Sequence, residues 1–166
     1  MSRYLDELRK CKARDDRGMM ANLRCILVEN KKHRAWPALN RLGVPIKDEV
    51  QSFIAGLYAT HPEETPVGNF GTTCKTIQRE RGEAENKENK LTPTERRFQH
   101  LLAAEKDEVC SRVLRMVRMA KALNANVRIN YTQLASDLKN WDDDIKTEWA
   151  AAFWTIGVAP ATEEDV

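Results

Sequence analysis

Hydrophobic residues recur along this chain at intervals of three and four, which is the period of an α-helix with one buried face. Met20, Leu23 and Leu27 form such a stripe near the N-terminus, and Leu134 and Leu138 belong to another near the C-terminus. Helices are predicted over residues 4–13, 17–28, 37–43, 46–60, 72–78, 92–102, 106–123, 131–139 and 142–154. Only seven glycines and six prolines occur in 166 residues, which argues against a turn-rich β-fold. The pattern therefore predicts an all-α protein.

One long segment interrupts this pattern. Residues 79–92 are almost entirely charged or small, so they cannot bury much apolar surface, and they are expected to form a mobile connector. Helix resumes at Thr92, which is followed by Pro93 and by Glu95, a capping-box arrangement. We therefore predict two small helical bundles: an N-terminal bundle over residues 1–78, the charged connector over 79–92, and a C-terminal bundle over 93–166 that ends in an acidic tail.

The net charge of +2 hides an uneven distribution. Residues 1–47 hold twelve Lys/Arg and five Asp/Glu, and residues 106–128 hold six against two. Residues 137–166 hold two against eight. A polyanion would meet two basic regions and avoid the C-terminal tail.

The segment 106–123 combines an apolar face with a cationic one. At 100° per residue, Val109, Val113 and Val117 fall on the side that must be buried. The opposite side and its flank carry Arg112, Arg115, Arg118 and Lys121. Guanidinium and ammonium groups in such a band could bind the phosphates of a nucleic acid, but a solvated helix face without a partner explains the spacing equally well.

Signals of an enzyme or a metal site are weak. The three histidines lack the spacing of metal ligands, and the run Asp142–Asp144 is better explained as a helix cap. The four cysteines are too far apart to make a CxxC pair and are interpreted as free thiols. The aromatic residues near the C-terminus could stack bases, although their spacing favours a core. We expect no catalytic residue, metal or cofactor.

No stretch approaches the roughly 18 apolar residues that a membrane-spanning helix needs. The first twelve residues are charged throughout and do not resemble a signal peptide. A cytoplasmic protein that does not contact membranes is therefore expected.

Several segments, in order, are similar to one known family. Residues 94–107 read TERRFQHLLAAEKD, residues 129–141 place Tyr131, Leu134, Leu138 and Trp141 at family spacing, and residues 55–59 read AGLYA. Together with the glycine-containing segment 68–75, they resemble the small subunit, CasB, of the type I-E CRISPR surveillance complex Cascade. Two features depart from the family pattern: the connector is longer and more acidic, and Asn130 stands where an aspartate is usual.

The resemblance implies a non-catalytic protein of two small helical bundles. It also implies partners, namely the backbone and large subunits of Cascade, a second copy of the chain, the guide RNA, and the target DNA with its displaced strand. A nucleic-acid role is carried onto residues at matching positions: Arg24, Lys75, Arg96, Arg97, Lys106, Arg112 and Arg115. Arg118 and Lys121 join this set from the helix-face pattern alone.

Two other classes of function remain open from the residues. A stand-alone helix-turn-helix regulator would need base-reading side chains on a helix after a tight turn, whereas the cations here lie in the middle of a helix. A helical scaffold that binds only protein would have no affinity for single-stranded DNA at low salt. An enzyme is the least favoured class, because no nucleophile, base and orienting group converge in the sequence.

Overall fold

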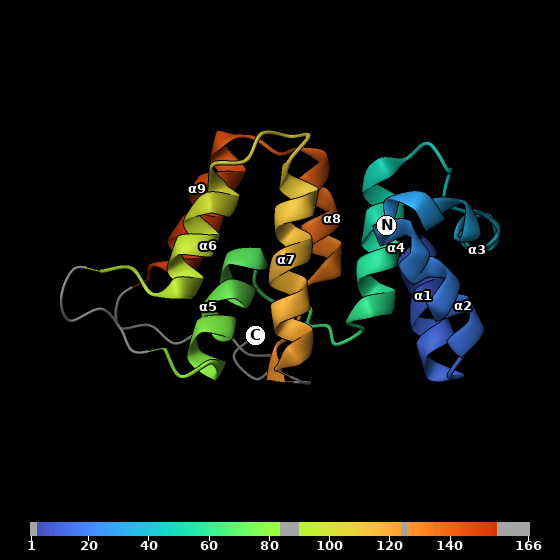
Figure 1. The fold of residues 1–166 in the computed structure, drawn as a ribbon, viewed down its shortest axis with the longest axis horizontal. Helices are drawn as coiled ribbons and strands as arrows, with labels where there is room; N and C mark the ends of the chain where they lie inside the picture. Colours follow the sequence, from blue (N-terminus) through green and yellow to red (C-terminus); the bar gives the residue numbers. More distant parts are fainter. Residues whose placement is uncertain (1–2, 84–89, 124–125, 156–166) are drawn as a thin grey trace. The chain divides into compact units, whose positions relative to one another are not determined.

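The computed structural model describes residues 3–83, 90–123 and 126–155 (Figure 1). Within these ranges the chain forms nine α-helices, two short 3₁₀-helices and one isolated β-bridge between Glu64 and Ile129. The elements are α1 (Arg3–Ala13), α2 (Arg17–Arg24), η1 (Cys25–Leu27), η2 (Glu29–Arg34), α3 (Trp36–Leu42), α4 (Glu49–Thr60), α5 (Phe70–Glu80), α6 (Pro93–Leu102), α7 (Val109–Ala122), α8 (Tyr131–Lys139) and α9 (Asp143–Phe153). The predicted all-α class is confirmed.

Local capping residues set most of the helix ends. The Thr92–Glu95 capping box is formed as predicted, with the Thr92 hydroxyl accepting from the Glu95 amide and the Glu95 carboxylate accepting from the Thr92 amide. The helix predicted from residue 46 instead begins at Glu49, because the Asp48 carboxylate accepts from the Gln51 amide and caps it there. The structure also contains η2, which the hydrophobic period did not predict.

The chain separates into two compact units, Met1–Pro62 and Glu63–Val166. The predicted N-terminal bundle ran to residue 78, whereas the structure places α5 in the second unit. Helix α5 packs closely against α9, with the rings of Phe70 and Trp149 centred 5.3 Å apart. The central part of the predicted connector, residues 84–89, and the acidic tail from residue 156 lie outside the described residues.

In the first unit, α4 is the central helix. Its residues Ile54 and Leu57 are fully buried, and α1, α2 and η1 pack around it. Gly56 allows the closest of these contacts, because a Cβ atom there would lie 2.3 Å from the side chain of Ile26 on η1. A side chain at position 56 would therefore force the side chains of Ile26 and Leu27 to shift.

In the second unit, the core is built around Trp149. Its ring lies 4.8 Å from that of Trp141, and its indole N–H donates to the buried carboxylate of Asp137 at 2.7 Å. A stacked pair, Phe98 and Phe153, joins α6 to α9 with ring centroids 4.5 Å apart. The sequence pattern favoured a core role for these C-terminal aromatic residues, and burial confirms it for Trp141, Trp149 and Phe153.

The two ends of the predicted connector are held beside each other. The Glu83 carboxylate accepts hydrogen bonds from the amide, at 2.9 Å, and from the hydroxyl of Thr94. The Thr92 hydroxyl donates to the side chain of Gln78 at 2.6 Å. Residues at both margins of the connector are thus part of the folded unit.

Candidate nucleic-acid interface

Helix α7 carries the most extensive exposed cationic face among the predicted site residues. Its inner face is fully buried through Val109, Val113 and Val117, which hold the helix against the core of the second unit. The outer side carries Arg115, Arg118 and Lys121, here called the α7 cation face, and all three are exposed. Residues three apart on a helix are neighbours, so these side chains form one row along the surface.

No acid among the described residues forms an ion pair with the three cations of this face. Within the described ranges, Arg115, Arg118 and Lys121 make no ion pair and no side-chain hydrogen bond. Their charge is therefore available to a ligand. Burial of the opposite side fixes the helix, so a ligand would meet a rigid array of donors.

Arg96 and Arg97 form a second exposed pair on α6, here called the α6 pair. They too make no ion pair or side-chain hydrogen bond within the described ranges. The adjacent acid, Glu95, is already engaged, because it caps Thr92 and accepts from the Trp154 indole at 2.9 Å. Helices α6 and α7 form a hairpin joined by residues 103–108 (Figure 1). At 1.5 Å per residue, Arg96 and Arg115 each lie about 9 Å from the turn, at a similar level of the hairpin.

The other four predicted site residues donate to backbone carbonyls near the C-terminal ends of helices. Carbonyls in the last turn of a helix have no partner inside that helix and carry the negative end of its dipole, so a cation there is stabilising. Three of the acceptors lie in a last turn, and Thr155 follows the end of α9. The four bonds are Arg24 to Ala59 at 3.2 Å, Lys75 to Thr155 at 2.9 Å, Lys106 to Lys139 at 3.0 Å and Arg112 to His100 at 2.6 Å. These positions have a structural task that the sequence pattern did not predict.

Arg112 is held most firmly of the four. One guanidinium nitrogen donates to the His100 carbonyl on α6, and the other donates to the Glu108 carboxylate at 2.7 Å. Its side chain is only 17% exposed. It braces α6 against α7, and we therefore leave it out of the surface proposed below.

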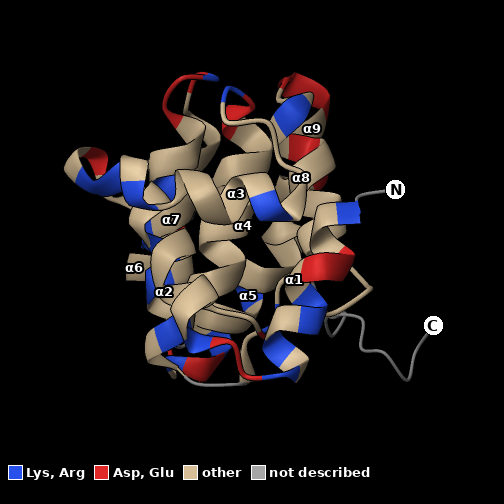
Figure 2. Ribbon diagram, turned by 90° about the vertical axis from the view of Figure 1, so that its right-hand side faces the viewer, with Lys and Arg blue, Asp and Glu red and all other residues tan. Residues whose placement is uncertain are grey.

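Part of the basic excess in residues 1–47 is paired with acids. Three of its cations pair with nearby acids: Arg9 with Asp6 at 2.9 Å, Lys10 with Glu7 at 3.2 Å and Arg17 with Asp15 at 3.3 Å. Figure 2 shows blue and red segments next to each other along α1. Two of the four cations on α1 are therefore engaged by acids of the same helix.

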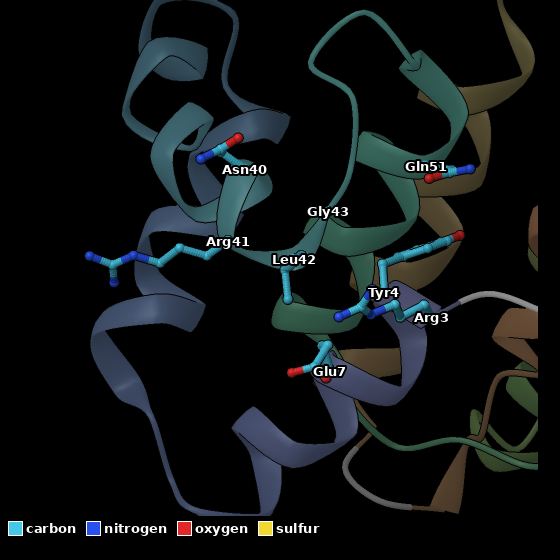
Figure 3. Close-up of a pocket in the computed structure, with 8 residues that line it drawn as sticks. All are labelled: Arg3, Tyr4, Glu7, Asn40, Arg41, Leu42, Gly43 and Gln51. Atoms are coloured by element: carbon cyan, nitrogen blue, oxygen red, sulfur yellow. The ribbon is translucent and has the colours of Figure 1, made fainter.

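The described ranges show little that is typical of an enzyme. A cleft of about 620 Å³ lies between α1, α3 and α4 (Figure 3). Its side chains do not converge: Arg41 and Gln51 extend to opposite sides of the view. No group of three His, Cys, Asp or Glu residues is arranged to hold a metal among the described residues.

The four cysteines are free thiols, as expected. Cys11 and Cys74 are buried, and removal from water raises the pKa of both thiols, that of Cys74 by far the more. A raised pKa disfavours the nucleophilic thiolate, so both side chains act as small apolar core residues. None of the helices in the described ranges has the length and apolar character that crossing a membrane requires.

One exposed aromatic residue, Trp36, is not among the predicted site residues. Trp36 is 43% exposed at the start of α3, and the His33 ring lies edge-on to it at 6.4 Å. Its position could have been noticed, because it follows a run of basic residues and precedes Pro37, where a helix begins.

The comparison with known families decides which protein group has this fold. The family model described as CRISPR-associated protein Cse2 matches residues 7–154. The chain belongs to the Cse2 family. The resemblance to the small subunit of Cascade is thereby confirmed at the level of the family.

Solved structures agree with the Cse2 assignment. The chain is 22% identical to a CRISPR-associated protein of the Cse2 family from Thermus thermophilus, with a TM-score of 0.68, covering 93% of this chain and 99% of the other. A second structure, CasB from Thermus thermophilus, is 21% identical with a TM-score of 0.66, covering 92% and 96%. CasB from M. ruber is 20% identical with a TM-score of 0.64, covering 92% and 93%. The curated protein sequences contain no match.

The departure from the family pattern at Asn130 has a local explanation. Asn130 caps α8, because its side-chain oxygen accepts from the Gln133 amide at 3.1 Å. Its side-chain nitrogen also donates to the Gly68 carbonyl at 3.0 Å, which an aspartate could not do. Asparagine therefore caps α8 and adds a hydrogen bond to the glycine-containing loop.

Proposed function

We propose that this Cse2 chain is a non-catalytic subunit of a type I-E Cascade complex whose second unit grips the nucleic-acid backbone. The supporting observation is that five predicted site residues are exposed and have no partner within the described ranges: Arg96, Arg97, Arg115, Arg118 and Lys121. They project from helices that are anchored by buried apolar faces. Such an array binds phosphates without reading the sequence of bases.

This mode of binding suits the formation of an R-loop. The guide-RNA–DNA heteroduplex is about as stable as the DNA duplex that it replaces, so modest contacts to the backbone can shift the balance. We propose that the α7 cation face and the α6 pair contact the heteroduplex or the displaced strand. The backbone and large subunits and a second copy of the chain are the proposed protein partners, and the complex would act in the cytoplasm in antiviral defence.

Removal of charge from the α7 cation face tests whether it binds nucleic-acid phosphates. The triple variant R115A/R118A/K121A should bind single-stranded DNA at least about tenfold more weakly at low salt, measured by fluorescence anisotropy. Each lost phosphate contact lowers the salt slope by about 0.7 for a single strand, so a loss of about 2 is expected in total. Far-UV circular dichroism should show unchanged helicity, because these side chains have no structural partner within the described ranges.

The matched control removes the same number of charges elsewhere. In R9A/K10A/R17A, each cation that is lost is already paired with an acid. This variant should keep affinity within about twofold of the original chain. Equal losses in both triple variants would show that only net charge matters and would contradict the proposed face.

Assembly is tested in the complex. The chain, added to a guide-RNA-loaded assembly of the backbone and large subunits, should join it and protect the displaced strand from nuclease. The R115A/R118A/K121A variant should still join but protect the strand poorly. A protein-only scaffold would give equal protection with both. A helix-turn-helix regulator would instead bind duplex DNA with sequence selectivity.

A further inference from the structure

The junction between η2 and α3 combines an exposed indole with exposed cations. Trp36 opens α3, and the neighbouring residues Ala35, Ala38 and Leu39 are buried, so the backbone beneath the indole is fixed in the first unit. Trp36 itself is nevertheless 43% exposed. We call the exposed residues Lys31, His33, Arg34 and Trp36 the Trp36 platform.

The cations of this platform differ from those on α1. Lys32 is paired with Glu29 at 2.8 Å, but Lys31 and Arg34 are exposed and make no ion pair or side-chain hydrogen bond within the described ranges. They lie on η2, just before Trp36. A ligand that meets the indole therefore also meets at least two available positive charges.

Trp36 is unlike the other three tryptophans of the chain. Trp141 and Trp149 are buried core residues, and their indole N–H groups donate to Ala104 and Asp137. Trp154 is 41% exposed, but its N–H donates to Glu95 and its ring packs on Phe98 and Phe153. The Trp36 indole has no hydrogen-bond partner within the described ranges, and its one ring contact there is the edge-on His33. Packing within the described unit leaves much of this large side chain uncovered.

We infer that the Trp36 platform binds single-stranded nucleic acid, with an unpaired base stacked on Trp36 and the adjacent phosphates held by Lys31 and Arg34. Base–aromatic stacking beside a positive groove is the general chemistry of sequence-tolerant single-strand binding. A duplex keeps its base faces covered, so only an unpaired strand can use both the indole and the cations. An acidic peptide would satisfy the cations alone.

This site goes beyond the proposed function, because it adds contacts to bases on the first unit, whereas the α7 cation face contacts only the backbone. The two sites also predict different behaviour. Backbone contacts favour any nucleic acid and are salt-sensitive. Stacking distinguishes single strands from duplexes and depends little on salt.

The experiment uses the full chain with a labelled oligodeoxythymidine strand and a duplex of the same length. The W36A variant should lose about fivefold or more in affinity for the single strand, with an unchanged salt slope and unchanged duplex binding. The W36F variant should bind nearly as well as the original chain, because phenylalanine retains an aromatic face. The K31A/R34A variant should lower the single-strand salt slope by about 1.4.

Ile46→Ala is the matched control, since Ile46 is an exposed apolar residue of the same unit at 48% exposure but has no aromatic face. It should bind both probes like the original chain. Unchanged single-strand binding by W36A, or an equal loss for strand and duplex, would overturn the platform. Either result leaves the proposed function standing if R115A/R118A/K121A still binds both the single strand and the duplex more weakly. Failure of the platform can therefore be distinguished from failure of the proposed function.

Discussion

A lysine or arginine on a helix can donate hydrogen bonds to a backbone carbonyl of its own chain or to a phosphate of another molecule. The residue type alone does not distinguish the two roles. Arg24 and Lys106 were predicted to contact nucleic acid, yet they donate to carbonyls 35 and 33 residues away in sequence. Those acceptors are backbone oxygens, which every residue has, so the residue type at the acceptor position does not predict the bond. Arg115 and Arg118, by contrast, lie opposite three buried valines, and the helical period alone predicts their exposure.

The two roles should separate in experiment. Arg112→Ala removes two charge-assisted hydrogen bonds, one to the His100 carbonyl on α6 and one to the Glu108 carboxylate at the start of α7, so the variant should lose about 1–2 kcal/mol of unfolding free energy. That corresponds to a fall in Tm of about 2–8 °C in thermal denaturation. Arg115→Ala should leave Tm unchanged within about 1–2 °C and weaken DNA binding more than Arg112→Ala does. A stable Arg112→Ala variant with the larger binding defect would reverse these assignments.

At the level of helices, the ends were predictable where the caps are local. Thr92 and Glu95 identify the start of α6 because both partners lie within one turn. The Asn69–Thr72 capping box also lies within one turn, but this residue pair is less distinctive. The predicted helix therefore begins at residue 72, two residues after the start of α5. The sequence could not indicate which helix packs against α5. That packing depends on a close contact with the backbone of α9, which lies far away in sequence.

Gly71 provides the test of that approach. A Cβ atom at this position would lie 2.1 Å from the carbonyl oxygen of Trp149, a backbone atom of α9 that cannot rotate away. Gly71→Ala should therefore destabilise the chain by about 2 kcal/mol or more, although alanine favours a helix by up to about 1 kcal/mol. Chemical denaturation with urea measures the change.

Gly18→Ala is the control for Gly71→Ala. Gly18 also lies in the first turn of a helix, but its Cβ atom would meet nothing closer than 4.0 Å. This variant should be neutral or slightly stabilised. If both variants were equally stable, α5 and α9 would not approach each other as closely as the structure shows.

At the level of the whole molecule, the all-α class followed from the hydrophobic period, but the division into units did not. The charged segment 79–92 was the most polar in the chain and was therefore predicted as the boundary. The structure instead divides the chain after Pro62, because Phe70 packs on Trp149 and Glu83 accepts from Thr94. Composition shows where a chain can be exposed, whereas a boundary is set by which elements share a core.

Fragments should show which boundary is correct. Residues 63–166 contain α5 and the complete core of the second unit, so this fragment should unfold in one cooperative thermal transition. Residues 79–166 lack α5, which leaves Trp149 without Phe70 and exposes the apolar side of α9. This shorter fragment should lose near-ultraviolet circular dichroism from its tryptophans and bind the dye ANS, as loosely packed helical states do. A fragment 79–166 that melts as cooperatively as 63–166 would restore the boundary at the connector, because α5 would then contribute nothing essential to the core.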